Sequence, residues 1–209
     1  MSDCCENKSC AIEALRGRQR GTLIAVLWIN AAMFVAILTA GMLAGSTAVL
    51  SDSLDNLGDA LTYGLTLYAV SRGDRAKARI ALIKGLLILG AGLFVASQLI
   101  YKLAHPVIPL YGTMTFASMA GLVANGICLA LLWKHRCDDV NMSSVWECSR
   151  NDIASNVSVL LAAGGVWLTG SAWPDLVVGA LLALLFLRSA TRVVRNASAV
   201  LAAQPARQA

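Results

Sequence analysis

Charged side chains are scarce in this sequence of 209 residues. Asp, Glu, Lys and Arg together make up 14% of it, whereas a soluble domain typically carries roughly 25%. Apolar residues make up 57%, and the mean hydropathy is +0.67. This composition excludes an ordinary soluble domain and predicts an integral membrane protein.

Catalytic and nucleotide-binding motifs are also missing. The sequence contains no glycine-rich phosphate-binding loop, no nucleophile elbow and no dinucleotide fingerprint. We therefore expect neither an enzyme nor an ATP-driven pump, and no prosthetic group. The net charge of +5 does not require a nucleic-acid partner, because an uneven distribution of Lys and Arg across a membrane explains it.

Six apolar runs of membrane-spanning length follow one another. They predict an all-α membrane protein with six transmembrane helices, at about 23–44, 47–70, 80–103, 113–133, 145–168 and 175–193. We divide the chain into a cytosolic cysteine-containing segment (1–22), a transmembrane domain (23–195) and a short cytosolic tail (196–209). The first segment lacks the pattern of a cleavable signal peptide.

Lys and Arg are concentrated on one side of these predicted helices. They precede the first helix, join the second to the third and the fourth to the fifth, and follow the sixth: Lys8, Arg16, Arg18, Arg20, Arg72, Arg75, Lys77, Arg79, Lys134, Arg136, Arg192, Arg195 and Arg207. On the other side there is only Lys102, at the end of the third predicted helix. Cytosolic loops carry this excess. We therefore expect both termini in the cytosol, in a multi-pass protein that has the lipid of the cytoplasmic (inner) membrane as its partner.

The second apolar run, which contains SDSLDNLGDALTYG, carries three carboxylates. Asp52, Asp55 and Asp59 fall within about 60° of one another on a helix. A charged residue in the hydrocarbon layer costs roughly 2.5–3.5 kcal/mol or more, so it indicates function. Three adjacent carboxylates repel one another unless a cation or protons lie among them, and this face should point into the protein. For Asp52 alone, a structural carboxylate bonded to a neighbouring helix is the alternative.

The fifth run supplies a second pair of polar groups. Cys148 and Asp152 are four residues apart and share a helix face, as Asp55 and Asp59 do. Two facing pairs give three carboxylates and one thiolate, a set that fits tetrahedral zinc. Two alternatives stay open: the aspartate pair instead bonds Arg150, and Cys148 is a small buried hydrophobic residue.

Two segments resemble a known family, the cation diffusion facilitators. The second helix of that family is similar to GSTAVLSDSLDNLGDAL, and its fifth and sixth helices are similar to ECSRNDIASNVSVLLAAGGVWLTGSAWPDLVVGALLALLFLRSA. The family pattern is a His or Asp followed four residues later by Asp, in helix two and again in helix five. Asp55 and Asp59 match the first pair, and Cys148 and Asp152 match the second. Asp52 matches an acidic residue just outside the metal site.

The resemblance implies a six-helix exporter of divalent transition metals, driven by counterflowing protons and acting as a homodimer. It also implies that Asp175 opens the sixth helix. The sequence lacks the family's C-terminal cytosolic domain and its His-rich loop, so we expect a short member. A thiolate at Cys148 favours Zn²⁺, with Cd²⁺ and Co²⁺ next. The alternative is a membrane-bound metal sensor or partner that binds an ion without transporting it.

Polar residues elsewhere have subsidiary interpretations. The segment DCCENKSC places Cys4, Cys5 and Cys10 in the cytosol, where they are candidate accessory ligands that gather metal. The alternative is an unstructured tail with reactive or lipidated thiols. Asn30 and Asn125 fall in the middle of predicted helices, where we expect them to form interhelical hydrogen bonds.

Overall fold

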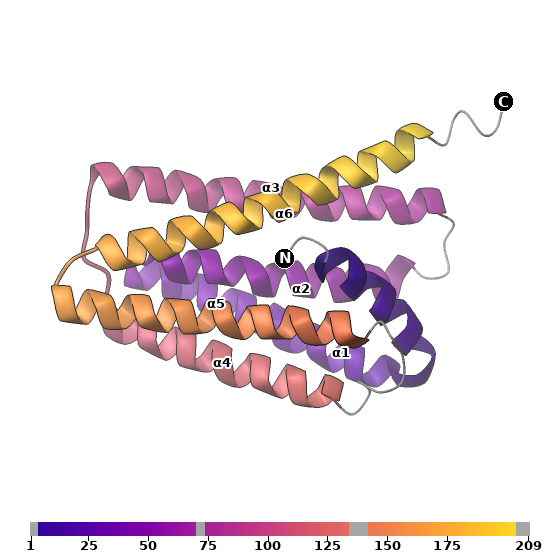
Figure 1. Ribbon diagram of the computed structural model, residues 1–209, viewed down its shortest axis with the longest axis horizontal. Coiled ribbons are helices and arrows are strands. Elements are labelled where there is room, and N and C mark those ends of the chain that lie inside the picture. Colours follow the sequence, from indigo (N-terminus) through magenta and orange to yellow (C-terminus); the bar gives the residue numbers. More distant parts are fainter. Residues whose placement is uncertain (1–3, 70–73, 134–141, 204–209) are drawn as a thin grey trace.

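The structure, a computed structural model, describes residues 4–69, 74–133 and 142–203. This part of the chain contains six helices and no strand (Figure 1). The helices are α1 Cys4–Ala44, α2 Thr47–Ala69, α3 Asp74–Ala104, α4 Tyr111–Trp133, α5 Met142–Thr169 and α6 Trp173–Ala203. The prediction of an all-α fold with six helices is confirmed.

The composition of these helices is that of a membrane bundle. Within the described residues, all helices except α2 contain a stretch long and apolar enough to cross a membrane. The 23 residues of α2 extend over about 34 Å at 1.5 Å per residue, but its three aspartates lower its hydropathy. Large apolar side chains are exposed on the outside of the bundle, to 72% for Leu43, 77% for Phe116 and 75% for Leu168. Lipid covers such a surface, so the chain is a multi-pass membrane protein.

Two helices are longer than the predicted spans. α1 begins at Cys4, so most of segment 1–22 continues the first helix. α6 continues to Ala203, into residues that we expected in the tail. The extension of α6 is stabilised by packing along α3, since a Cβ atom added to Gly85 would meet the side chain of Val194 at 2.8 Å. Hydropathy could not predict this extension, because the extension depends on close packing between two helices rather than on contact with lipid.

Three short connections lie at one end of the bundle, on the left in Figure 1, which we call the short-turn end. They are residues 45–46, 105–110 and 170–172. At the other end, which we call the loop end, α2 and α4 finish and α3 and α5 begin. Residues 70–73 and 134–141 are outside the described part of the chain. Gly45 and Gly170 have φ angles of 61° and 59°. A residue without a Cβ atom adopts this left-handed conformation at little cost, so α1 and α5 end abruptly and the chain reverses.

Asp175 joins the first turns of α2 and α6. Its carboxylate accepts hydrogen bonds from the backbone N–H groups of Thr47 and Ala48, at 2.8 and 3.0 Å, and from the hydroxyls of Ser46 and Thr47, at 2.5 and 2.8 Å. The two N–H groups are among those that a helix N-terminus leaves unpaired. Gly179 permits the close approach, because a Cβ atom there would lie 2.8 Å from the carbonyl carbon of Thr47. Asp175 lies in the first turn of α6, as the resemblance implied, but it caps α2.

Replacing Asp175 by Ala should strongly destabilise the protein. The change removes these hydrogen bonds and leaves two buried N–H groups of α2 unpaired, at about 1–3 kcal/mol each. We expect a loss of about 3 kcal/mol or more in the free energy of unfolding, measured by thermal or denaturant unfolding in detergent. Ser171→Ala is the matched control, because the Ser171 hydroxyl accepts only a 3.4 Å bond from the Trp173 N–H at the same helix end. Equal stability of the two variants would contradict the capping role.

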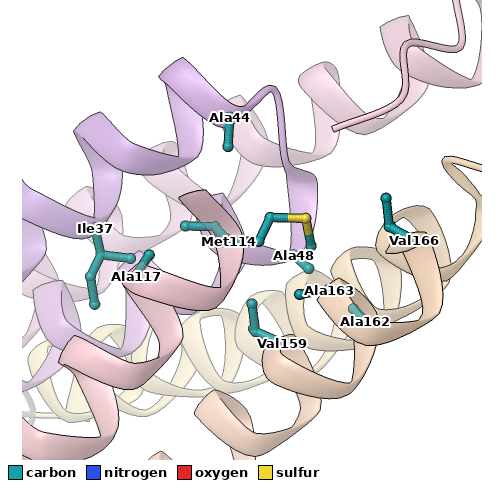
Figure 2. Close-up of a cluster of buried hydrophobic side chains, with 10 residues drawn as sticks. Ile37, Ala44, Ala48, Met114, Ala117, Val159, Ala162, Ala163 and Val166 are labelled. Atoms are coloured by element: carbon teal, nitrogen blue, oxygen red, sulfur yellow. The ribbon is translucent and has the colours of Figure 1, made fainter. Parts of the chain in front are cut away.

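Two apolar clusters hold α2 in the middle of the bundle. The first joins α1, α2, α4 and α5 in the half nearer the short-turn end, and Figure 2 shows Met114 of α4 reaching toward Ala48 of α2. Its buried members are Ile37, Ala44, Ala48, Val49, Met114, Ala117, Val159, Ala162, Ala163 and Val166. The second packs α3 and α6 onto α2 through Leu50, Leu54, Val95 and Ala183. This packing directs the polar face of α2 toward α5.

Candidate metal site

The polar faces of α2 and α5 lie against each other. The hydroxyl of Ser155 in α5 donates a hydrogen bond of 2.7 Å to the carboxylate of Asp52 in α2, and both side chains are buried. Asp152 lies three residues before Ser155 on the same helix, about one turn from this bond. The alternative interpretation of Asp52, a structural carboxylate bonded to a neighbouring helix, predicts a bond of this kind.

This hydrogen bond sets the depth of α5 relative to α2. The two helices are antiparallel, because α2 starts at the short-turn end and α5 finishes there (Figure 1). Both rise about 1.5 Å per residue, so three residues toward the loop end bring Asp55 level with Asp152. Four more residues bring Asp59 level with Cys148. The four predicted ligands therefore occupy two adjacent levels of one helix–helix interface.

The structure describes three of the four predicted ligand side chains. Asp55, Asp59 and Asp152 are partly buried, and each interacts with other groups of the protein. Among the described side chains, no three Asp, Glu, His or Cys residues are close enough together to hold a metal ion. Asp55, Asp59 and Asp152 are therefore not gathered around one point in this conformation. The predicted ligand set stays a prediction, and only the depths of the backbone positions support it. Outside the described part are the side chains of Cys148, Arg150, Cys4, Cys5 and Cys10.

Two further helices bring polar groups to these levels. Asn30 of α1 donates a 3.8 Å hydrogen bond to the Sγ atom of Cys128 in α4, which confirms the interhelical bond expected for Asn30. Asn156 of α5 packs against Gly121 of α4. Because α4 and α5 are antiparallel, Asn125, four residues beyond Gly121, lies at the level of the candidate ligands, where it is buried. Its own expected hydrogen bond stays a prediction.

Two polar residues of this region are not found by the sequence argument. Lys84 of α3 is only 7% exposed, and its ammonium donates a hydrogen bond to the hydroxyl of Thr62, one turn beyond Asp59 on α2. The available signal was a single lysine in the apolar run ALIKGLLIL. Asn56, which follows Asp55, is 3% exposed. The indication for Asn56 in the sequence was weaker, because a neutral amide among several aspartates draws no attention as a possible ligand.

Apolar packing closes the site toward the short-turn end. One turn beyond Asp52 and Ser155 in that direction lie Ala48 on α2 and Val159 on α5, and both belong to the apolar cluster of Figure 2. Interiors packed in this way leave few voids as large as a water molecule. In the described residues, apolar side chains of α2 and α5 therefore lie directly between the candidate site and the short-turn end.

The membrane part of the sequence identifies the family. Residues 23–202 match the family described as the cation efflux transmembrane domain. The chain belongs to the cation efflux family. This confirms the resemblance to the cation diffusion facilitators and makes the chain a membrane protein of cation transport. No curated protein matches it.

In this cation efflux protein, Lys84 should weaken the binding of a divalent ion. Its buried ammonium is held one turn from Asp59 by the bond to Thr62, and two positive charges repel each other most where water is excluded. We expect Lys84→Met to bind Zn²⁺ about 10-fold more tightly than the unmodified protein. Lys84→Arg, which keeps the charge, is the control. Calorimetric titration in detergent measures the affinities, and equal affinities of Lys84→Met and the unmodified protein would show that the ammonium does not act on the ion.

Proposed function

We propose that this chain exports divalent transition-metal ions, Zn²⁺ first and Cd²⁺ and Co²⁺ next, in exchange for protons. The observation that carries the proposal is the hydrogen bond between Ser155 and Asp52. With this bond, the backbone positions of the two predicted ligand pairs lie at neighbouring depths of α2 and α5, which supports a site between them. Membership of the cation efflux family supports the transport of a cation. The residue types of the proposed ligands support Zn²⁺ as the cation and protons as the counter-ion.

The proposed ligands are Asp55, Asp59, Cys148 and Asp152. Three carboxylates and one thiolate satisfy four-coordinate Zn²⁺, and the thiolate favours Zn²⁺ and Cd²⁺ over harder ions. An ion at this position is the transported substrate. The partial burial of the three aspartates suits a site that must both strip water from an ion and release it.

Protons compete with the ion for the same ligand atoms. A carboxylate or a thiol binds metal only after it loses its proton. A site that opens to one side of the membrane and then to the other therefore takes up protons where it gives up metal. We assign both roles to Asp59 and Asp152, one on each helix, so that exchange needs no separate coupling device.

The orientation of the bundle gives the direction of transport. The Lys and Arg distribution favours a loop end and two termini in the cytosol, and we propose a homodimer in the cytoplasmic membrane. The apolar cluster of Figure 2 then closes the site toward the outside. Release of the ion requires a second conformation in which α2 and α5 separate at this cluster.

Flux measurements in proteoliposomes test the proposal. Vesicles with an acidic lumen should take up Zn²⁺ through the purified protein, and their lumen should become less acidic as they do. Collapse of the pH gradient with a proton ionophore should stop the uptake, and Asp55→Ala should show neither change. Saturable binding without flux would contradict export and favour the metal sensor.

A further inference from the structure

Asn56 is a buried amide for which the described part of the protein supplies no hydrogen-bond partner. Its side chain is 3% exposed, and neither Oδ1 nor Nδ2 has a partner among the described groups. Burial of an amide without a partner is costly. Such a group in a folded protein calls for an explanation, and a ligand or an ion is one of the few available.

The position of Asn56 on α2 directs it toward the candidate site. On the helix it lies about 40° from Asp52 and about 60° from Asp59. Asp52 faces α5, since it accepts the bond from Ser155. Asn56 lies four residues from Asp52 toward the loop end, and Asp152 lies three residues from Ser155 in the same direction. The two residues are therefore at nearly the same depth. The amide of Asn56 therefore faces the interface at the depth where the proposed ligands meet.

We propose that the side-chain oxygen of Asn56 is an additional ligand of the transported ion and makes the site five-coordinate. This inference rests on the proposed function and adds a specificity-determining residue to it. An amide oxygen is a neutral, hard ligand. Zn²⁺ in proteins is satisfied by four ligands, whereas Co²⁺ readily accepts five or six. Asn56 thus lets the protein bind Co²⁺ alongside Zn²⁺.

Asn156 provides a matched control in the same protein. It is 1% exposed, and its Oδ1 also has no partner among the described groups. Its Nδ2, however, donates a 2.9 Å hydrogen bond to the backbone oxygen of Asp152, and its side chain packs against Gly121 of α4. It lies one turn nearer the short-turn end than the proposed ligands, so we expect it to take no part in holding the ion.

The test compares Asn56→Leu with Asn156→Leu in purified, metal-free protein. Leu has the same number and branching of side-chain heavy atoms as Asn. Asn56→Leu removes a buried amide without a partner and should unfold at a higher temperature than the unmodified protein without metal. Asn156→Leu also loses the bond to Asp152 and should gain less. Only Asn56→Leu should then lose Co²⁺ affinity, by about 10-fold relative to its Zn²⁺ affinity. Asn56→Asp, which keeps an oxygen at this position, should retain Co²⁺ binding.

Unchanged relative affinities in Asn56→Leu would overturn the inference while leaving the proposed function intact, because Asp55→Ala tests that function separately. The unmodified protein offers a second measurement that does not depend on a variant. Five-coordinate Co²⁺ absorbs visible light weakly and tetrahedral Co²⁺ absorbs it intensely. The spectrum of the Co²⁺-bound protein should therefore be weak, and an intense tetrahedral spectrum would contradict a fifth ligand.

Discussion

Asp59→Ala and Asp152→Ala should each abolish the exchange of Zn²⁺ for protons. The two carboxylates come from facing helices at adjacent levels of one interface. Each change removes a ligand of the ion and a group that binds the exchanged proton. Loss of a residue that only orients a metal ligand costs 10–100-fold, so loss of the ligand itself should slow exchange by about 100-fold or more. The initial rate of Zn²⁺ uptake into proteoliposomes with an acidic lumen measures the effect.

A control variant separates this effect from misfolding. Ser158 lies on α5 away from the face of Asp152, and its hydroxyl donates only to the backbone oxygen of Ala154, at 2.8 Å. Ser158→Ala should therefore transport at the normal rate. Asp59→Asn, which keeps the shape of the side chain, should fold normally and still fail to transport. Near-normal exchange by Asp59→Ala or Asp152→Ala would remove that residue from the site.

Cys148→Asp should keep transport but change the order of preferred ions. The variant replaces the single soft ligand of the proposed set by a hard carboxylate. Soft thiolates select Zn²⁺ and Cd²⁺, whereas carboxylates suit Mn²⁺. We expect Cd²⁺ uptake to fall and Mn²⁺ uptake to rise, so that their ratio changes by at least about 10-fold. Competition of the ions for uptake into the same vesicles measures the ratio.

A buried cysteine of α4 provides the control for this prediction. Cys128 of α4 lies within hydrogen-bond distance of Asn30, not in the α2–α5 interface. Cys128→Ser should leave the ratio of Cd²⁺ to Mn²⁺ uptake unchanged. An unchanged ratio in Cys148→Asp would show that this thiol is not a ligand, and the interpretation of Cys148 as a small buried residue would then hold.

The sequence was sufficient to predict the helices and to single out the candidate ligand pairs, because both inferences depend on local pattern. Apolar runs report burial in lipid, and residues four apart in one run share a helix face whatever the other helices do. For the same reason Asp55 and Asp59 were visible as a pair before any contact was known. Family membership then confirmed the transporter class from residues 23–202.

Features that depend on contacts between helices could not be predicted. The depth of α5 against α2 is set by Ser155 and Asp52, which are far apart in the sequence. The capping of α2 by Asp175 depends on the close approach of α6. In the sequence, Lys84 is an isolated cation, and its hydrogen-bond partner Thr62 belongs to another helix. Such pairings follow from packing, and no local pattern reports them.

Proton release on metal binding tests most directly whether ion and protons share the carboxylates of α2 and α5. Calorimetric titration of the purified protein with Zn²⁺, in buffers that differ in their enthalpy of protonation, counts the protons released for each ion bound. The shared-ligand site predicts that Zn²⁺ displaces protons from the protein at the pH of fastest exchange and that Asp55→Ala loses the binding. Tight Zn²⁺ binding without proton release, equal in the unmodified protein and in Asp55→Ala, would contradict it.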